Sequence, residues 1–191
     1  MTQATSDPVL RDALVAAIPN MRAFAVSLTG NADRADDLVQ ETLVKAWHKL
    51  DTFQTGTNLK AWLFTILRNA YFSEFRKQKR EVPDVDGEHS ARLSVRAAQL
   101  GHLDMQDLAR ALEQLSEDQR EALLLVAAEG FSYEEAAEIA GCAVGTIKSR
   151  VNRARVRLAE LMHITSADDL ATDPVAGDII LAGASPVRSR G

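Results

Sequence analysis

The chain has 191 residues, of which 26% are charged and 5% aromatic, and a formal net charge of −5. This length allows one large or two small domains, and few aromatic residues in a sequence rich in Ala and Leu favour an all-helical protein over a sheet protein. The single cysteine, Cys142, excludes an intramolecular disulfide and fits a cytoplasmic location, and the sequence shows neither a signal-peptide pattern nor an apolar run long enough to span a membrane.

The first helix is predicted to start at Asp7-Pro8 and to end at Gly30-Asn31, with Pro19 kinking or splitting it. The second helix is predicted over residues 32–50. Four of its residues fall near one stripe, which are Leu38, Thr42, Ala46 and Trp47.

The first half of this second helix carries an acidic surface. Its members are Asp33, Asp36, Asp37, Gln40 and Glu41. Carboxylates near a helix N-terminus complement the helix dipole. That explanation accounts for Asp33 and Asp36 but is weaker for Gln40 and Glu41, which lie further along the helix.

A polar loop, residues 53–58, contains Gly56 and leads to a third helix that is predicted to start after Asn58 and to run over residues 59–80. Its wide apolar face consists of Leu59, Trp62, Leu63, Ile66, Leu67 and Ala70. The aromatic residues Tyr71, Phe72 and Phe75 then precede a basic run, residues 76–80. Aromatic and basic side chains together suit unstacked bases, although Trp62 and Phe72 taken singly are expected in the core.

Residues 82–103 lose helical periodicity and are interpreted as a flexible linker, with a short helix at 90–100. A second set of helices starts near Asp104. One of its helices is predicted over residues 117–129, capped by Ser116 together with Gln119 and burying Leu123, Leu124, Leu125 and Val126. Residues 164–191 are predicted to be mostly disordered.

Residues 130–158 have the pattern of two short helices joined by a tight turn. Ser132 and Glu135 have the spacing of a capping box, and Gly141 is placed to end the first helix. The second helix begins near Val144 and carries five cations and no carboxylate between residues 148 and 157. This pattern is typical of a helix-turn-helix that places its second helix in the DNA major groove. A basic helix that docks on an acidic protein is the alternative.

Wheel arithmetic separates a buried from a polar side of that second helix. The residues predicted to face the core are Ile147, Val151, Ala154 and Leu158. The candidates for DNA contact are Thr146, Lys148, Ser149, Arg150, Asn152, Arg153, Arg155 and Arg157. Arg150 and Arg153 are expected to face base edges, whereas Lys148 and Arg155 lie further round, where phosphates are the expected partners.

Three segments together resemble the extracytoplasmic-function (group IV) bacterial sigma factors over residues 7–163. Residues 36–47 resemble region 2.1–2.2 of that family, residues 59–69 resemble regions 2.3–2.4, and residues 115–158 resemble region 4. The resemblance implies two small helical domains, a region 2 domain at 7–81 and a region 4 domain at 104–163, with the linker at 82–103. The sequence itself contains no Walker loop, no paired-carboxylate constellation and no Cys/His metal set, so we expect no enzymatic activity and no cofactor or metal.

The resemblance also implies the roles of individual residues. Asp37, Gln40 and Glu41 match the surface that docks on the clamp helices of the polymerase β′ subunit, while region 4 meets the β flap. The residues that match the pocket for a base flipped from the −10 element, or that hold phosphates near it, are Phe53, Thr55, Gly56, Thr57, Asn58, Asn69, Arg76, Lys77, Lys79 and Arg80. Residues 146–157 match the helix that reads the −35 element.

Within this family, residues 80–87, 131–137 and 143–155 look like the EcfG group, which directs the general stress response of alphaproteobacteria. That likeness implies a NepR-type anti-sigma factor as a partner, itself controlled by a PhyR-type anti-anti-sigma factor. Two alternatives remain open at this point. One is a sigma-like decoy that sequesters an anti-sigma factor, and the other is a conventional helix-turn-helix regulator that binds duplex DNA by itself.

Overall fold

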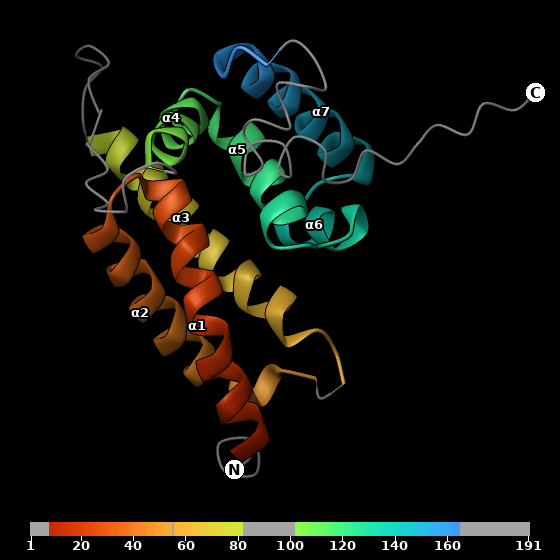
Figure 1. Cartoon of the computed structure of the whole chain (residues 1–191). Coiled ribbons are helices and arrows are strands. Elements are labelled where there is room, and N and C mark those ends of the chain that lie inside the picture. The colour runs from red at the N-terminus through yellow and green to blue at the C-terminus, as the bar shows by residue number, and fades with distance from the viewer. Residues whose placement is uncertain (1–7, 55, 82–101, 165–191) are drawn as a thin grey trace, which may run out of the picture. The chain divides into compact units, whose positions relative to one another are not determined.

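The computed structural model describes residues 8–54, 56–81 and 102–164, and these ranges contain helices and no strand (Figure 1). The all-α prediction is confirmed. The helices form two compact units, which are described separately below. The sequence-predicted linker, its short helix at 90–100 and the tail from Thr165 onward lie outside the described residues.

The first unit is built from α1 (Pro8–Thr29), α2 (Ala32–His48) and α3 (Leu59–Glu81), each of which packs against the other two. Its core contains Met21, Phe24, Leu28, Leu38, Leu63, Phe64 and Leu67. The rings of Phe24 and Phe64 lie 5.1 Å apart between centroids. The Tyr71 hydroxyl donates to the Leu28 carbonyl at 3.2 Å, so this buried polar group is satisfied.

Pro19 was predicted to kink or split the first helix, and the structure shows that it does not split it. α1 is assigned as one helix from Pro8 to Thr29 with Pro19 inside it. The ring of Pro19 is exposed, while Leu14 and Met21 on either side are buried. Burial of apolar residues on both sides therefore outweighs the one backbone hydrogen bond that proline removes.

The turn between α1 and α2 is fixed by local contacts. Gly30 has φ +65°, a conformation that glycine adopts without strain, and the Asn31 side chain accepts a hydrogen bond from the Arg34 amide at 2.9 Å, which caps α2. Arg22 on α1 meets Asp36 on α2 with a Nε–Oδ1 distance of 2.6 Å and a Nη2–Oδ2 distance of 3.2 Å. The Asp36 carboxylate raises the pKa of the Arg22 guanidinium above its ordinary value.

The second helix is shorter than predicted and exposes one of its expected stripe residues. α2 ends at His48, and a short 3-10 turn, η2 (Leu50–Thr52), buries Leu50. Leu38, Thr42 and Ala46 are buried, but Trp47 is 47% exposed. Trp47 follows Ala46 directly, and one residue is a rotation of about 100° around the helix, so the ring is carried off the stripe.

The second unit contains α4 (His102–Glu113), α5 (Glu117–Leu123), α6 (Tyr133–Ala140) and α7 (Val144–Leu161). The single helix predicted at 117–129 is instead α5 followed by a π turn, η3 (Leu124–Ala128), where the Glu129 amide donates to the Leu124 carbonyl at 3.0 Å. Ser116 and Gln119 form the predicted capping box. Leu123, Leu124 and Leu125 are buried, whereas Val126 is half-buried.

The helix-turn-helix prediction is confirmed in its local detail. The Ser132 hydroxyl accepts a hydrogen bond from the Glu135 amide at 3.1 Å, and Glu135 accepts one from the Ser132 amide at 2.9 Å. Gly141 has φ +64° and ends α6. α7 then buries the four residues of its predicted core face, which are Ile147, Val151, Ala154 and Leu158.

Two polar side chains, which the sequence pattern did not predict as contacts, connect the helices of this unit. The Arg120 side chain donates to the carbonyls of Leu112, Glu113 and Leu115 at 2.8, 2.8 and 3.2 Å, so it satisfies backbone groups at the C-terminal end of α4. The Arg150 side chain on α7 meets Asp118 at the start of α5, with Nη2 2.6 Å from Oδ2. In addition, no helix in the described ranges is long and apolar enough to cross a membrane.

The Ser132 cap gives a stability prediction. Ser132→Ala removes the acceptor for the Glu135 amide and should lower the free energy of unfolding by about 0.5–2 kcal/mol. Urea unfolding followed by far-UV circular dichroism measures this value. Ser149→Ala is the matched control, because the exposed Ser149 hydroxyl only donates to the Thr146 carbonyl within the same helix. Equal losses in the two variants would contradict the role of the cap.

Candidate nucleic-acid interface

The buried stripe of α7 determines which side of the helix meets solvent. The exposed residues of the helix are Gly145, Lys148, Ser149, Asn152, Arg153, Val156, Arg157 and Glu160. Five of the eight sequence-predicted contact residues lie in this set, while Thr146, Arg150 and Arg155 are half-buried. α7 therefore presents a polar face with Lys148, Arg153 and Arg157 as its exposed cations.

The three exposed cations differ in their surroundings. The Lys148 ammonium lies 5.6 Å from the ring centroid of Tyr133 on α6, which is within the range of a cation–π contact. Arg157 pairs with Glu160 one turn further on, at 3.0 Å. Arg153 has no ion pair or hydrogen bond to any residue that the structure describes. Arg153 is consequently the arginine of α7 that is most available to an external anion.

Arg150 is engaged inside the protein. Its side chain is 22% exposed, it forms the 2.6 Å ion pair with Asp118, and its Nη1 lies 3.7 Å from the Cys142 sulfur in the turn. These contacts tie the start of α7 to α5 and to the turn before it. Arg150 and Arg153 were predicted as equivalent base readers, but the structure places them in different environments.

Arg155 is also less accessible than its place on the helix wheel suggests. Its Nε and Nη2 atoms are buried and have no hydrogen-bond partner among the described residues. A buried donor without an acceptor is costly, and these two atoms do not face solvent in the free protein. The exposed Lys148 is thus better placed than Arg155 to meet a phosphate.

In the first unit, hydrogen bonds between side chains and nearby backbone groups shape the loop before α3. Gly56 has φ +95°, and a side chain there would be strained although nothing lies within 4 Å of an added Cβ. The Thr57 hydroxyl donates to the Gln54 carbonyl at 2.8 Å, and the Asn58 side chain accepts from the Ala61 amide at 3.1 Å, which caps α3. The ring of Phe53 packs on Trp62 with centroids 5.2 Å apart. Thr55 lies outside the described residues.

Asn58 and Asn69 lie on one face of α3. They are eleven residues apart, which is about three turns and roughly 16 Å along the helix. Asn69 is exposed, and no hydrogen bond to another described residue occupies its amide. Arg76, about two turns beyond Asn69 on the same face, is exposed and donates from Nε to the Phe72 carbonyl at 3.1 Å. The loop, Asn69 and Arg76 therefore form a row along α3.

The remaining residues predicted to contact the −10 element, and the aromatic residues near them, differ in exposure. Lys77 is exposed, whereas the side chains of Lys79 and Arg80 lie outside the described residues although α3 runs through them. Trp62 and Phe72, both expected in the core, are half-buried. The Arg68 guanidinium lies 4.6 Å from the ring centroid of Phe72. The polar row on α3 thus has half-buried aromatic rings beside it.

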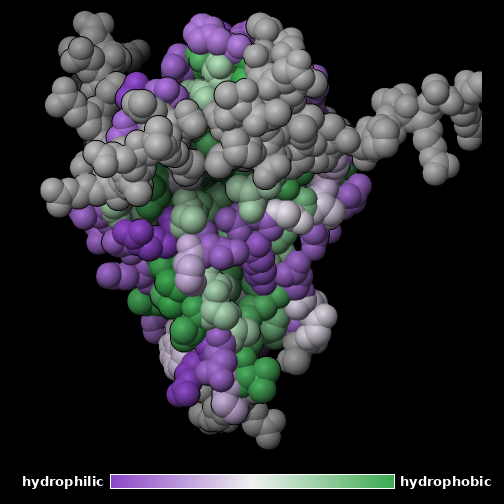
Figure 2. Space-filling view, viewed as in Figure 1, coloured by the Kyte–Doolittle hydropathy of each residue, from purple (hydrophilic) through white to green (hydrophobic). Residues whose placement is uncertain are grey.

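The acidic surface of α2 is exposed except at Asp36, which is half-buried and pairs with Arg22, and it adjoins exposed apolar side chains. Asp37, Gln40 and Glu41 are exposed, and Glu41 pairs with Lys45 at 2.5 Å. Val44 is 57% and Trp47 47% exposed on the following turns. Figure 2 likewise shows hydrophobic side chains between hydrophilic ones on the surface of the first unit. Exposed large apolar residues beside a charged patch are common in protein-binding surfaces.

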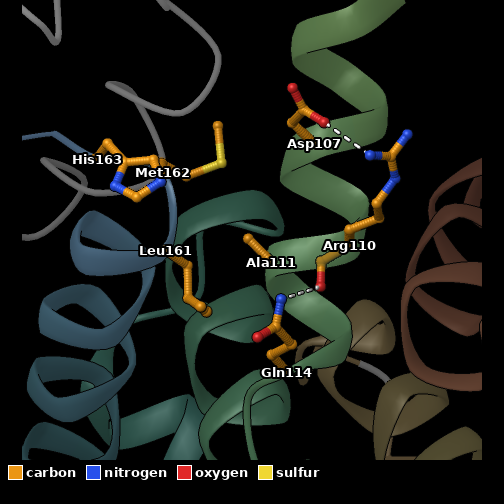
Figure 3. A pocket seen from close by; sticks show the side chains of 7 residues that line it. All are labelled: Asp107, Arg110, Ala111, Gln114, Leu161, Met162 and His163. Atoms are coloured by element: carbon orange, nitrogen blue, oxygen red, sulfur yellow. Dashed lines mark hydrogen bonds and ion pairs between the residues drawn. The ribbon is translucent and has the colours of Figure 1, made fainter.

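The second unit also contains a pocket. A pocket of about 330 Å³ in the second unit is lined by Asp107, Arg110, Ala111, Gln114, Leu161, Met162 and His163 (Figure 3). Its charged side chains Asp107 and Arg110 pair with each other at 3.2 Å. No group of three or more His, Cys, Asp or Glu residues in the described ranges could hold a metal ion.

Comparison with known proteins assigns both units. Residues 14–81 match the family Sigma-70 region 2, and residues 105–158 match Sigma-70, region 4. The chain is 56% identical, over 90% of its length and 94% of the relative, to "ECF RNA polymerase sigma factor EcfG" of Rhodopseudomonas palustris.

Two solved structures extend the comparison. The sigma factor RpoE, solved in complex with the anti-sigma factor NepR from Bartonella quintana, matches with a TM-score of 0.76 and 54% identity, covering 84% of this chain and 100% of that chain. The PhyRSL–NepR complex from Sphingomonas sp. Fr1 matches with a TM-score of 0.60 over 83% of this chain and 92% of that chain, and at 22% identity it shows the fold alone. The resemblance found in the sequence is confirmed: this chain belongs to the ECF RNA polymerase sigma factors.

Proposed function

We propose that this chain is an alternative sigma factor that binds core RNA polymerase in the cytoplasm and directs it to the promoters of general stress response genes. The observation that carries the proposal is the exposed face of α7, where Lys148, Arg153 and Arg157 meet solvent and no carboxylate occurs between residues 145 and 159. A one-sided basic helix after a tight turn has the charge and shape to enter the major groove.

The two units divide the promoter between them in this proposal. Residues 104–163 bind the −35 element as duplex through α7, and residues 7–81 hold the −10 element at the row formed by the loop, Asn69 and Arg76. Residues 82–103 connect the two. The cost of opening the strands is met by capture of exposed bases and by polymerase contacts, since sigma factors are not normally enzymes.

The acidic surface of α2 is the proposed docking site for the β′ clamp helices, while the second unit meets the β flap. Asp37, Gln40 and Glu41 contribute charge and hydrogen-bond acceptors, and the exposed Val44 and Trp47 add apolar area next to them. A docking surface with an apolar centre and a polar surround has the composition of protein interfaces in general.

Run-off transcription tests the function and the docking surface together. The chain should direct core polymerase to start at a general-stress promoter, and the double change Gln40→Ala and Glu41→Lys should reduce co-elution with core polymerase and run-off product without loss of helicity, because both side chains are exposed. Asp12→Lys on α1 is the control, since it makes the same change of charge at an exposed site elsewhere.

Unchanged co-elution of the double variant would remove the docking assignment. Absence of run-off product from the unmodified chain, together with tight binding to isolated duplex, would favour a conventional regulator. Absence of both, with binding to an anti-sigma factor alone, would favour a decoy.

The −10 row is tested at Asn69. Asn69→Ala removes an exposed amide that can both donate and accept, and should cost about 1–3 kcal/mol at one promoter base if the amide reads that base. Run-off assays on promoters substituted singly through the −10 element measure the preference. Ser73→Ala, one turn further along α3 and also exposed, should leave the preference unchanged. Retention of every −10 preference in the Asn69 variant would contradict the assignment.

The face of α7 is tested by comparing Lys148 with Arg153. Lys148→Ala should weaken all promoters about equally and reduce the slope of log affinity against log salt by about one unit, as loss of a phosphate contact does. Arg153→Ala should instead relax preference within the −35 element by roughly 1–3 kcal/mol, if the guanidinium bonds a guanine edge. Profiles of −35 substitutions in reconstituted holoenzyme separate the two results.

Arg150→Ala and Asp118→Ala provide the controls, because each breaks the same ion pair and should lower the stability of the second unit. Identical and uniformly weakened −35 profiles for the Lys148 and Arg153 variants would mean that α7 recognises the backbone and its shape rather than base edges.

We further propose that a small NepR-type anti-sigma factor holds this chain in unstressed cells and is removed by a phosphorylated PhyR-type protein. Support comes from the 54% identity to an RpoE chain solved with NepR. Affinity purification of the tagged chain from unstressed cells should recover such a protein, and that protein, once purified, should inhibit run-off transcription. Recovery of no inhibitor would contradict this part of the proposal.

A further inference from the structure

Lys148 is an exposed cation of α7 whose ammonium lies against an aromatic ring of another helix. Its Nζ is 5.6 Å from the ring centroid of Tyr133, a half-buried residue at the start of α6. No hydrogen bond or ion pair joins the Lys148 ammonium to another residue that the structure describes. A cation within about 6 Å of a ring centroid is attracted to the negative face of the ring. The ring of Tyr133 therefore holds the ammonium in the free protein.

The position of Tyr133 is fixed by the contacts of α6. Ser132 and Glu135 exchange hydrogen bonds at 3.1 and 2.9 Å, and this capping box sets where the helix begins. Ile139 on the same helix is buried, and Gly141 with φ +64° makes the turn that leads to α7. Hydrogen bonds and packing along α6 thus hold the ring in place beside the first turns of α7.

A ring and a carboxylate hold a cation in different ways. Arg150 on the same helix is paired with Asp118 at 2.6 Å, and it must lose that carboxylate before it can bind another anion. The ring of Tyr133 carries no net charge, so the charge of Lys148 is not neutralised, and an ammonium has three N–H groups with which to meet a further acceptor. Lys148 is therefore oriented and still able to bind a phosphate.

We propose that Tyr133 is a positioning residue for DNA binding, which holds the Lys148 ammonium ready for a phosphate of the −35 duplex. The inference rests on the proposed function, because it requires that α7 enters the major groove. In a helix-turn-helix the first helix crosses the DNA backbone while the second lies in the groove, so the start of α6 and the first turns of α7 both lie near phosphates. A lysine side chain loses conformational entropy when it binds one phosphate, and the ring reduces this loss by restricting the side chain beforehand.

A double-mutant cycle in reconstituted holoenzyme tests the coupling of the two residues, with binding to a labelled promoter duplex measured by fluorescence anisotropy. Tyr133→Leu removes the ring and should weaken binding roughly two- to fivefold, the size of an exposed cation–π contact. In the Lys148→Ala background the same change should have no effect, because the side chain that the ring positions is gone. Arg157→Ala is the matched control background. It also removes an exposed cation of α7, but Arg157 pairs with Glu160 at 3.0 Å, so the loss caused by Tyr133→Leu should persist there.

Tyr133→Phe separates the ring from the hydroxyl and should bind the promoter as tightly as the unmodified chain does. A loss equal to that of Tyr133→Leu would overturn the proposal, because the hydroxyl would then be the group that acts. Equal losses from Tyr133→Leu in every background would also overturn it, since Tyr133 would then act without Lys148. Failure of the unmodified holoenzyme to bind any promoter would instead remove the proposed function, and this inference with it.

A second measurement needs no DNA and tests the contact in the free full-length chain. The ring current of an aromatic residue shifts the proton signals of a side chain held over its face. The Hε signals of Lys148 should therefore lie upfield of those of the other lysines, and they should keep this shift in Tyr133→Phe and lose it in Tyr133→Leu. Ordinary Lys148 signals in the unmodified chain would overturn the positioning role, whatever the stability of the variants or the result with DNA.

Discussion

The packing of the apolar stripe of α7 is the constraint on which the functional surface of the second unit depends. Ile147, Val151, Ala154 and Leu158 are almost fully buried, and the helix packs against α5. Burying these side chains supplies the driving force, and their spacing leaves only one rotation of the helix in which all four are covered. The exposed face, with Lys148 and Arg153, is therefore fixed by the opposite side of the same helix. The position of this surface therefore does not depend on contacts among its own exposed side chains.

Polar contacts between helices further stabilise the position of α7. One of them occupies the charge of Arg150, which is then not free to bind an external anion. The ion pair of Arg150 with Asp118 connects α7 to α5, and Arg120 satisfies the carbonyls that end α4. A guanidinium occupied by a carboxylate at 2.6 Å must lose that partner before it can bind another anion. The arginines of α7 thus differ: Arg150 supports the helix, Arg155 is half-buried, and Arg153 and Arg157 remain exposed.

In the first unit, α3 likewise has a buried side and a polar side that is a candidate binding surface. One side of this helix supplies Leu63, Phe64 and Leu67 to the core, while the row of the loop, Asn69 and Arg76 lies on the polar side. Local features shape the described part of the loop before it, because Gly56 takes the left-handed conformation and Asn58 caps the helix. Secondary structure therefore positions this surface as well, at intervals set by the rise of the helix.

The sequence by itself determined most of the helices, the caps at Ser116 and Ser132 and the buried stripe of α7, because each depends on residues within a few turns of one another. It also determined the family, because three motifs occur in the order and at the spacing that the family shows. Only the tertiary structure decided that Pro19 stays inside one helix, that a π turn follows α5, that Trp47 is exposed and that Arg150 and Arg153 differ. The partner of Arg150 lies 32 residues away in the chain. Periodicity records which side of a helix is apolar, but a polar contact between helices depends on their relative rotation and leaves no periodic trace in either one.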